Sequence, residues 1–136
     1  ILSSIVEKLV ETQIEADGKQ PHELQRTKSL TYSILNLTGL SKLAFLGRKD
    51  GVQIDIWNYR SNTGDLQKAY DYLLPFLKTP DQWSFKQLGS MKNAVEKLRR
   101  MFRNTGSMLS IKEYCKLGHN TKKVDHLDIL LYPCNR

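Results

Sequence analysis

The chain has 136 residues, of which 40% are hydrophobic and 26% are charged, and it carries a formal net charge of +7. That length suits one domain that buries about two thirds of its unfolded surface, and the longest apolar runs are far shorter than the ~20 residues of a membrane-spanning helix. The excess of Lys and Arg favours a polyanionic partner, such as an acidic polysaccharide, a nucleic acid or an anionic membrane, or else only solvates the surface.

Apolar residues recur at helical spacing from the first turn of the chain onward. They predict an amphipathic helix over residues 2 to about 16. The chain begins with Ile1 inside this pattern, and no basic stretch precedes the apolar residues. We therefore expect a fragment or a processed product, with no signal peptide in this part of the sequence.

The segment from Asp17 to Ser33 contains a turn signal, a bend and two residues whose side chains are candidates for catalysis. Asp17-Gly18 is typical of a turn, because Gly adopts a positive φ at little steric cost. Gln20-Pro21 favours an extended pair, since the residue before Pro avoids the helical region. Arg26 and Tyr32 follow at a spacing of six residues. An arginine beside a tyrosine stabilises the phenolate, so a proton-transferring pair is one interpretation of this spacing.

A second helix is predicted over residues 27–46, which are largely apolar. Gly39 lies inside this helix at a cost of about 1 kcal/mol, which predicts a close helix contact at that point. Gly47 is typical of a helix end. Residues 51–63 alternate too briefly to predict a strand, and we interpret them as an ordered loop.

The second half of the chain shows further helical patterns. We predict helices over residues 65–78, 90–102, 107–117 and 124–130. Pro75 is expected to bend or end the first of these. No linker or low-complexity stretch divides the sequence, so residues 1–136 are expected to form a single helical domain. Periodicity alone allows either an irregular bundle or stacked antiparallel hairpins.

Cysteine and histidine spacing predicts no metal or cofactor site. Cys115 and Cys134 form either one disulfide or two free thiols, and the sequence leaves that choice open. His22, His119 and His126 do not have the spacing of metal ligands. Motifs for nucleotide binding, serine hydrolysis or zinc-dependent proteolysis are absent from the sequence.

Four sequence motifs between Gln13 and Gly89 resemble the C-terminal part of the alginate lyase family. In order they are DGKQPHELQRTKSLTYSILNLTGL, GVQIDIWNYR, DLQKAYDYLLPF and WSFKQLG, and the sequence LLYP at 130–133 resembles the family's ending. These enzymes cleave uronic-acid polymers by β-elimination. The resemblance implies an all-α fold, a partial α/α toroid of antiparallel helical hairpins that is incomplete relative to the full family domain. It also implies a periplasmic or secreted location.

The resemblance assigns the catalytic roles to Tyr32 and Arg26. The tyrosine of this motif transfers a proton to the leaving oxygen and, in syn elimination, also removes one, while the arginine stabilises its phenolate and holds the substrate carboxylate. Thr31 stands where the family often has His. The alternative, purely structural roles are a buried tyrosine for Tyr32 and a surface or helix-capping arginine for Arg26.

Five further residues are candidates for substrate binding. Gln20 and His22 flank the bend, and the amide or imidazole of either can donate to a sugar acid. Trp57, Tyr59 and Arg60 form an aromatic and basic cluster in which rings can stack on sugars and Arg can bind a carboxylate. The alternatives are a solvated histidine and a tryptophan that belongs to the core.

The family's Asn-His pair, which neutralises the substrate carboxylate, has no counterpart in this sequence. We therefore expect an N-terminal segment or a second chain to complete the toroid and supply that pair. The leading interpretation is a lyase that acts on an acidic polysaccharide such as alginate or glucuronan. A catalytically silent domain that binds acidic polysaccharides is the second, and a basic nucleic-acid-binding protein is the third and least favoured. Neither a nucleic acid nor a membrane is expected as a partner.

Overall fold

The structure, a computed structural model, describes residues 1–118 and 130–134 and is built from helices. In chain order these are α1 (Leu2–Gln13), α2 (Pro21–Leu24), α3 (Ser29–Gly47), α4 (Leu66–Leu73), the 3-10 helices η1 (Leu74–Leu77) and η2 (Pro80–Gln82), α5 (Met91–Leu109) and α6 (Lys112–Leu117). The described residues contain no strand, only an isolated bridge between Lys28 and Gln87. The all-α prediction is therefore confirmed.

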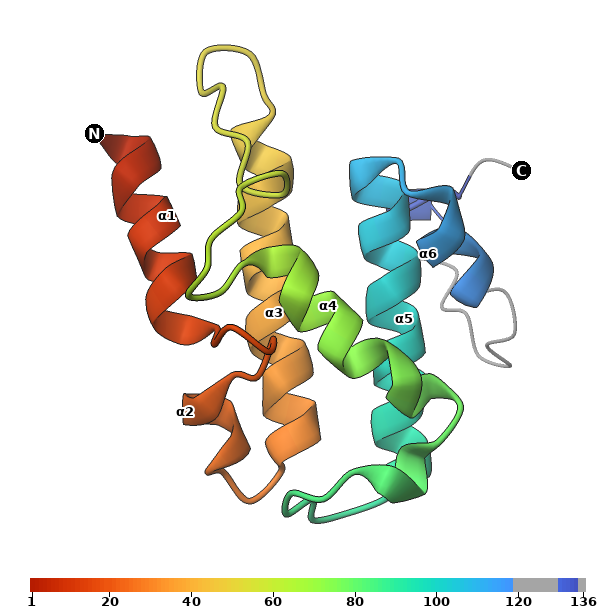
Figure 1. Cartoon of the computed structure of the whole chain (residues 1–136). Coiled ribbons are helices and arrows are strands. Elements are labelled where there is room, and N and C mark those ends of the chain that lie inside the picture. Colours follow the sequence, from red (N-terminus) through yellow and green to blue (C-terminus); the bar gives the residue numbers. More distant parts are fainter. Residues whose placement is uncertain (119–129, 135–136) are drawn as a thin grey trace.

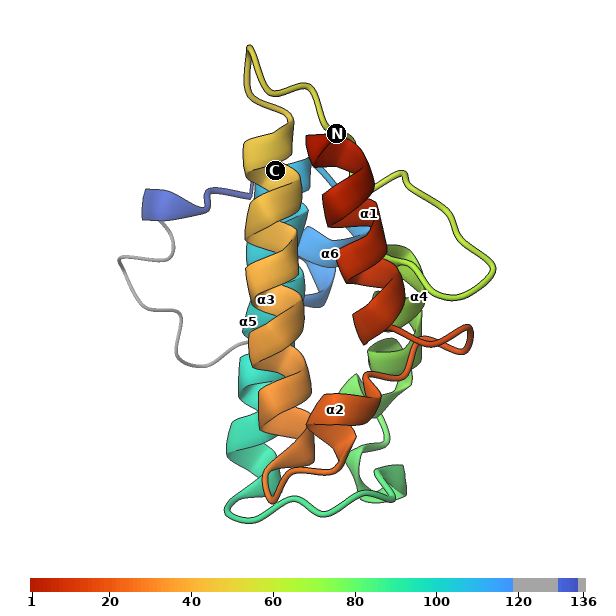
Figure 2. The same cartoon turned by 90° about the vertical axis from the view of Figure 1, so that its left-hand side faces the viewer.

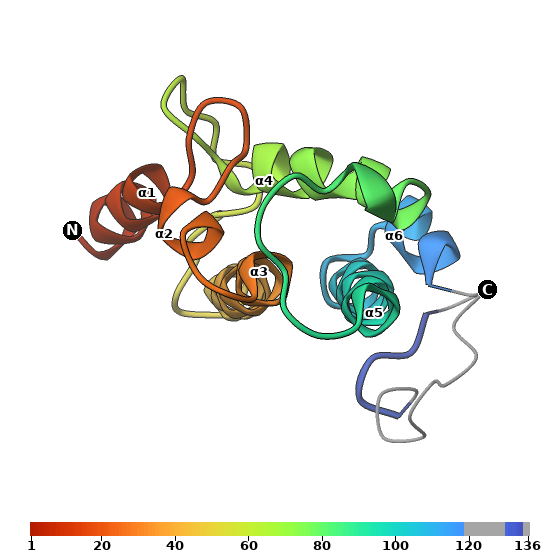
Figure 3. The same cartoon turned by 90° about the horizontal axis from the view of Figure 1, so that it is seen from below.

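The long helices lie in two layers. Helices α3 and α5 run side by side in the same direction, while α1, α4 and α6 run in the opposite direction (Figure 1). Seen along the helix axes, α4 and α6 lie on one side of the α3–α5 pair, and α1 lies beyond α3 at the far end from α6 (Figure 3). Successive long helices in the chain therefore alternate in direction. No helix in the described part of the chain is both long and apolar enough to cross a bilayer.

The turn after α1 packs against the start of α4 through two glycines. Gly18 has a φ of +89°, and a Cβ there would overlap the carbonyl of Lys68. Gly64 has a φ of +155°, and a Cβ there would overlap the carbonyl of Ile14. Asp65 caps α4, since its side chain accepts a hydrogen bond of 2.9 Å from the Lys68 N–H. The predicted turn at Gly18 is confirmed, and it fixes the direction in which the chain leaves α1.

A fully buried tyrosine joins the two layers. The hydroxyl of Tyr70 in α4 lies 2.5 Å from the hydroxyl of Ser41 in α3 and 2.6 Å from that of Thr105 in α5. Burial raises the pKa of Tyr70 to about 12, so the group stays protonated and can donate one of these bonds. The aromatic rings packed around it at edge or stacking distance belong to Trp57, Phe102 and Tyr114.

Several helix boundaries differ from the predicted ones. The predicted helix over 65–78 ends as an α-helix at Leu73 and continues as η1, which contains Pro75. The two helices predicted over 90–102 and 107–117 are present as α5 and α6, but the break between them was placed too early. The helix α5 continues through residue 106 to Leu109, and the break falls at Ser110, whose φ is +58°. The short helix α2 was not predicted, and the helix predicted at 124–130 lies largely outside the described residues.

The end of the described chain is fastened to α5 and α6. Cys115 in α6 and Cys134 form a disulfide, with their Cα atoms 5.8 Å apart. The hydroxyl of Ser107 in α5 also donates a 2.8 Å hydrogen bond to the carbonyl of Pro133. The sequence left the state of the two cysteines open, and the structure has them paired.

Candidate active site

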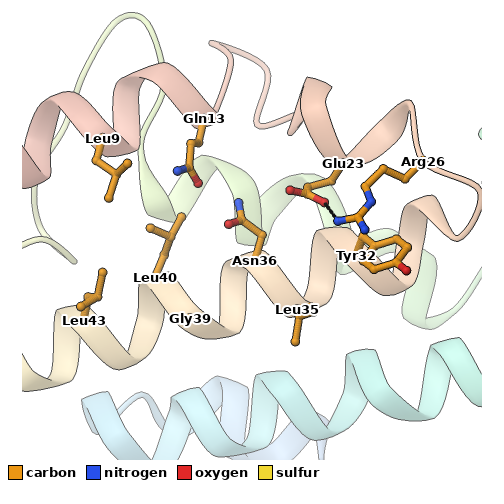
Figure 4. Close-up of a pocket in the computed structure, with 10 residues that line it drawn as sticks. All are labelled: Leu9, Gln13, Glu23, Arg26, Tyr32, Leu35, Asn36, Gly39, Leu40 and Leu43. Carbon is orange, nitrogen blue, oxygen red and sulfur yellow. Dashed lines mark hydrogen bonds and ion pairs between the residues drawn. The ribbon is translucent and has the colours of Figure 1, made fainter.

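A groove lies along α3 on the side that faces α1 and α2. Its volume is about 440 Å³, and Figure 4 shows its lining residues. Helices α1 and α2 follow one another beside α3 and form the opposite wall (Figure 2). Toward α2 the lining is polar, and toward the other end it is mainly leucine. The lining residues are Leu9, Gln13, Glu23, Arg26, Tyr32, Leu35, Asn36, Gly39, Leu40 and Leu43. We call this cavity the Tyr32 groove.

The structure brings Arg26 and Tyr32 together at the polar end of the groove. The guanidinium carbon of Arg26 lies 3.4 Å from the centroid of the Tyr32 ring, a cation–π arrangement. An Nη1–H of Arg26 donates to Glu23 at 3.4 Å, so the arginine lies between a carboxylate and an aromatic face (Figure 4). Tyr32 is half-buried and lines the groove, and the Arg26 charge lies over its ring.

The first turn of α3, which carries Tyr32, is held from a distant part of the chain. The side-chain carbonyl of Gln87 accepts hydrogen bonds from the N–H groups of Leu30 (2.9 Å) and Thr31 (3.3 Å), so a remote residue caps the helix. The Gln87 amide also donates to the Thr31 hydroxyl at 2.9 Å. Ser29 is anchored in the same way, because its hydroxyl donates to the carbonyl of Lys86 at 2.6 Å. This anchoring fixes the direction of Tyr32.

Gln20 supports the groove from behind. Its side chain is 3% exposed, its amide donates to the carbonyl of Ser33 at 3.2 Å, and its carbonyl accepts from the Asn36 amide at 2.8 Å. Both ends of the Gln20 side chain are therefore used within the protein. This placement speaks against the predicted contact between Gln20 and a substrate carboxylate and indicates a residue that positions Asn36.

Two amides that the sequence analysis did not select face the groove. Asn36 lies one helical turn after Tyr32 and keeps a second amide hydrogen, because only one is donated to Gln20. Gln13, at the end of α1, has a buried side-chain oxygen with no hydrogen-bond partner. Such an orphan acceptor is costly unless a ligand or water pairs with it. Figure 4 shows the two amides facing each other across the groove.

A second cavity of about 380 Å³ adjoins the groove and contains His22. It is lined by Thr12, Gln13, His22, Glu23 and Asn36, so it shares three residues with the Tyr32 groove. His22 is exposed at this position, beside the acid that pairs with Arg26. Of the residues predicted to bind substrate, His22 therefore lies at the candidate site.

The predicted cluster of Trp57, Tyr59 and Arg60 lies outside the groove. Trp57 is 7% exposed and packs edge-on against core aromatic rings, which favours the alternative of a core tryptophan over a stacking surface for sugar. The Tyr59 hydroxyl donates to Glu11, and this bond raises the pKa of Tyr59. Arg60 donates to the backbone carbonyls of Trp57 and Tyr59 at 3.0 and 3.1 Å.

Gly39 leaves the floor of the groove open. A close helix contact was predicted here, but Gly39 is exposed and a Cβ would meet no atom within 4 Å. Packing against a neighbouring element therefore does not offset the low helix propensity of Gly39. Among the described residues no group of three His, Cys, Asp or Glu side chains is placed to hold a metal ion. The chemistry available to the groove is that of a phenol, a guanidinium, a carboxylate and two amides.

The comparisons with known proteins agree on one family. A family model described as alginate lyase matches residues 1–83. A solved structure, an alginate lyase from Bacteroides ovatus, superposes with a TM-score of 0.77 at 27% sequence identity and covers 90% of this chain. The chain spans 33% of that protein's length. No curated protein sequence matches the chain. Because the family model covers more than half of the residues and the fold agrees, the chain belongs to the alginate lyase family.

Proposed function

We propose that the chain is the C-terminal catalytic segment of a polysaccharide lyase that cleaves uronic-acid polymers such as alginate or glucuronan by β-elimination. The observation that carries the proposal is the Tyr32 groove, in which Arg26 covers the ring of Tyr32 and two amides line the same cavity. Membership of the alginate lyase family supports a lyase, and the groove suggests which side chains do the chemistry.

β-Elimination on a uronate removes the proton at C5 and breaks the bond between C4 and its glycosidic oxygen. The electron pair of the C5–H bond forms the C4=C5 double bond, and the leaving oxygen takes up a proton. In syn elimination both protons move on one face of the sugar, so one phenol can serve both steps. Tyr32, as phenolate, accepts the C5 proton and then passes a proton to the leaving oxygen.

Arg26 supports Tyr32 through electrostatics. A guanidinium over the ring attracts the negative charge that the ring carries as phenolate. The ion pair with Glu23 holds the Arg26 guanidinium in one orientation. A substrate carboxylate would compete with Glu23 for this guanidinium. Asn36 and Gln13 are suited to sugar hydroxyls or to the substrate carboxylate, because amides both donate and accept.

The proposal includes a partner, which is either an N-terminal segment or a second chain that completes an α/α toroid. It would supply the Asn-His pair that this chain lacks. Two features support it. Leu2 and Ile5 of α1 are 59% and 60% exposed, and the chain spans one third of its structural neighbour. The disulfide fits a periplasmic or secreted location, since disulfides persist in oxidising compartments.

The test is the substitution Tyr32→Phe in the complete enzyme. We expect the formation of unsaturated uronate ends, followed by ultraviolet absorbance, to fall by about 10²–10⁴-fold, because the phenol that transfers protons is lost while the ring under Arg26 remains. Tyr72→Phe is the matched control. Tyr72 is a half-buried tyrosine in α4 whose ring packs against Phe76 and Trp83, away from the groove, and its loss is expected to leave the rate within twofold.

Parental activity in the Tyr32→Phe enzyme would reject the proposed role. A catalytically silent binding domain is the second candidate function, and the missing Asn-His pair favours it. That function predicts retention on an immobilised polyuronate with no unsaturated ends formed by the parent protein.

A further inference from the structure

A third cavity, which has a basic lining, lies on the other side of α3, between α3 and α5. Its volume is about 300 Å³. Three of its lining residues are cationic, namely Lys42 of α3 and Lys97 and Arg100 of α5. The others are Thr38, Met101, Asn104, Thr105, Met108, Leu131 and Tyr132. We call it the α3/α5 cavity.

The charged residues among the described lining of this cavity are all basic. No carboxylate is among its described lining residues. Lys42 and Lys97 are exposed, and within residues 1–118 and 130–134 their ammonium groups make no hydrogen bond or ion pair. The ammonium groups of Lys42 and Lys97 thus have no counter-charge within these residues, and a concave site that carries such groups concentrates oppositely charged ligands. The arrangement is therefore suited to an anion.

The cavity has fixed walls. Its outer wall is formed by Leu131 and Tyr132, which belong to the segment held by the Cys115–Cys134 disulfide and by the Ser107 bond to Pro133. On α5 the side-chain oxygen of Asn104 accepts a 3.3 Å hydrogen bond from Arg103, which leaves its amide hydrogens as donors. An anion in the cavity would thus meet an amide donor as well as the ammonium groups.

The α3/α5 cavity and the Tyr32 groove share the helix between them. Tyr32 and Lys42 are ten residues apart on α3, which corresponds to about 15 Å along the helix axis. Gly39 lies in this interval without a side chain, and the space at its Cβ position is open. A polymer that crosses α3 at Gly39 can reach both sites, whereas a single sugar cannot.

We propose that the α3/α5 cavity binds a carboxylate of an acidic polysaccharide and anchors the polymer at a distance from Tyr32. The inference rests on the proposed function, because that function makes a polyuronate the expected anion. A nucleic acid is less suited, since its single strands are held by rows of aromatic side chains and Tyr132 is the aromatic residue in this lining.

The experiment compares two double variants of the chain by isothermal titration calorimetry with polymannuronate at low and at high salt. Lys42→Ser/Lys97→Ser removes the two ammonium groups of the cavity. Lys8→Ser/Lys112→Ser is the matched control, because it removes the same charge from exposed positions on α1 and α6. We expect the first variant to bind on the order of tenfold more weakly at low salt, and the control to change by less than twofold. Circular dichroism establishes that both variants are folded.

Equal losses of affinity in the two double variants would mean that the polymer is attracted only by the net charge of the protein. Unchanged affinity in both variants would mean that the polymer does not touch the cavity. Either result overturns the inference. Tighter binding of single-stranded DNA than of polymannuronate, lost in the cavity variant, would also overturn it. Turnover is scored separately from binding, by the ultraviolet absorbance of unsaturated ends. A protein that forms no unsaturated ends but loses affinity in the cavity variant keeps the anchoring site and loses the proposed function. The opposite pattern keeps the function and loses the site.

Discussion

Gln20 shows how a single buried amide can organise a site without touching a ligand. It bonds the backbone of α3 at Ser33 and the side chain of Asn36 one turn further along. Because Gln20 is 3% exposed, water cannot replace either bond if its amide is removed. Loss of the Gln20 amide is therefore expected to lower the stability of the domain and to free the Asn36 side chain to change its orientation.

We therefore expect Gln20→Met to lower the free energy of unfolding by about 1–3 kcal/mol, because it keeps the side-chain length but removes the buried hydrogen bonds to the Ser33 carbonyl and the Asn36 amide. Gln25→Met is the control, since Gln25 is exposed in the same turn region and its replacement is expected to change stability by less than about 0.5 kcal/mol. Urea unfolding measures both. Equal effects in the two variants would show that the buried bonds of Gln20 contribute nothing.

At the scale of residues, the sequence predicted the pairing of Arg26 with Tyr32 because the motif resembles a known family. It did not predict Gln13, whose position in the groove depends on how α1 packs beside α3. Asn36 did have a local signal, since it follows Tyr32 by four residues and so lies on the same helix face. Trp57 was ambiguous because a tryptophan near an arginine suits both a core and a sugar site.

Two glycines show how the same residue type serves opposite purposes in different elements. Gly39 lies inside α3 with open space at its Cβ position. Gly64 precedes α4 at a φ of +155°, pressed against the carbonyl of Ile14. A side chain is therefore tolerated at the first position and excluded at the second.

We expect Gly39→Ala to raise the free energy of unfolding by about 0.5–1 kcal/mol, because alanine has the higher helix propensity and meets no neighbour. Gly64→Ala, the matched substitution, is expected to lower it by more than about 1 kcal/mol, since the new methyl group overlaps backbone. Thermal or urea unfolding of the two variants gives the sign of each change in the free energy of unfolding. A destabilising Gly39→Ala would show that a second surface covers this position.

Element prediction succeeded where the local pattern was strong. The apolar spacing of α3, the proline after α4 and the turn at Gly18 are each decided by neighbouring residues. It failed where the deciding contact is remote. Nothing near residues 102–107 reveals that α5 continues, because the break depends on Ser110 adopting a left-handed conformation. The capping of α3 by Gln87 is likewise a tertiary contact.

At the scale of the whole molecule, no helix of the described residues covers the outer flank of α1 in the two-layer arrangement. Large apolar residues on α1 and α3 are left at the surface, among them Leu2, Ile5, Leu35 and Leu46 at 54–64% exposure. Exposed apolar side chains mark an interaction site where they form a contiguous surface. These side chains lie on or beside the helix that begins the chain, which agrees with the proposal that a further segment or chain completes the domain.

We expect the chain alone to self-associate at micromolar concentration through α1, detected by sedimentation velocity. Leu2→Ser/Ile5→Ser is expected to shift the protein toward monomer, because it removes apolar surface from the free face of α1. Val52→Ser/Leu88→Ser removes exposed apolar side chains from loops elsewhere and is expected to leave association unchanged. Monomer at every concentration, or equal effects of both variants, would contradict this expectation.

All the side chains around Tyr32 come from one uninterrupted stretch, residues 9–43. Most enzyme centres collect their groups from distant parts of a chain and are lost when any one part drifts. Here a single exchange of DNA can carry all the side chains that line the Tyr32 groove into another gene, while the cap that Gln87 provides has to come from the recipient. Natural variation that alters the groove among related proteins is therefore expected to concentrate in this short window, and a library confined to it samples every position that lines the Tyr32 groove.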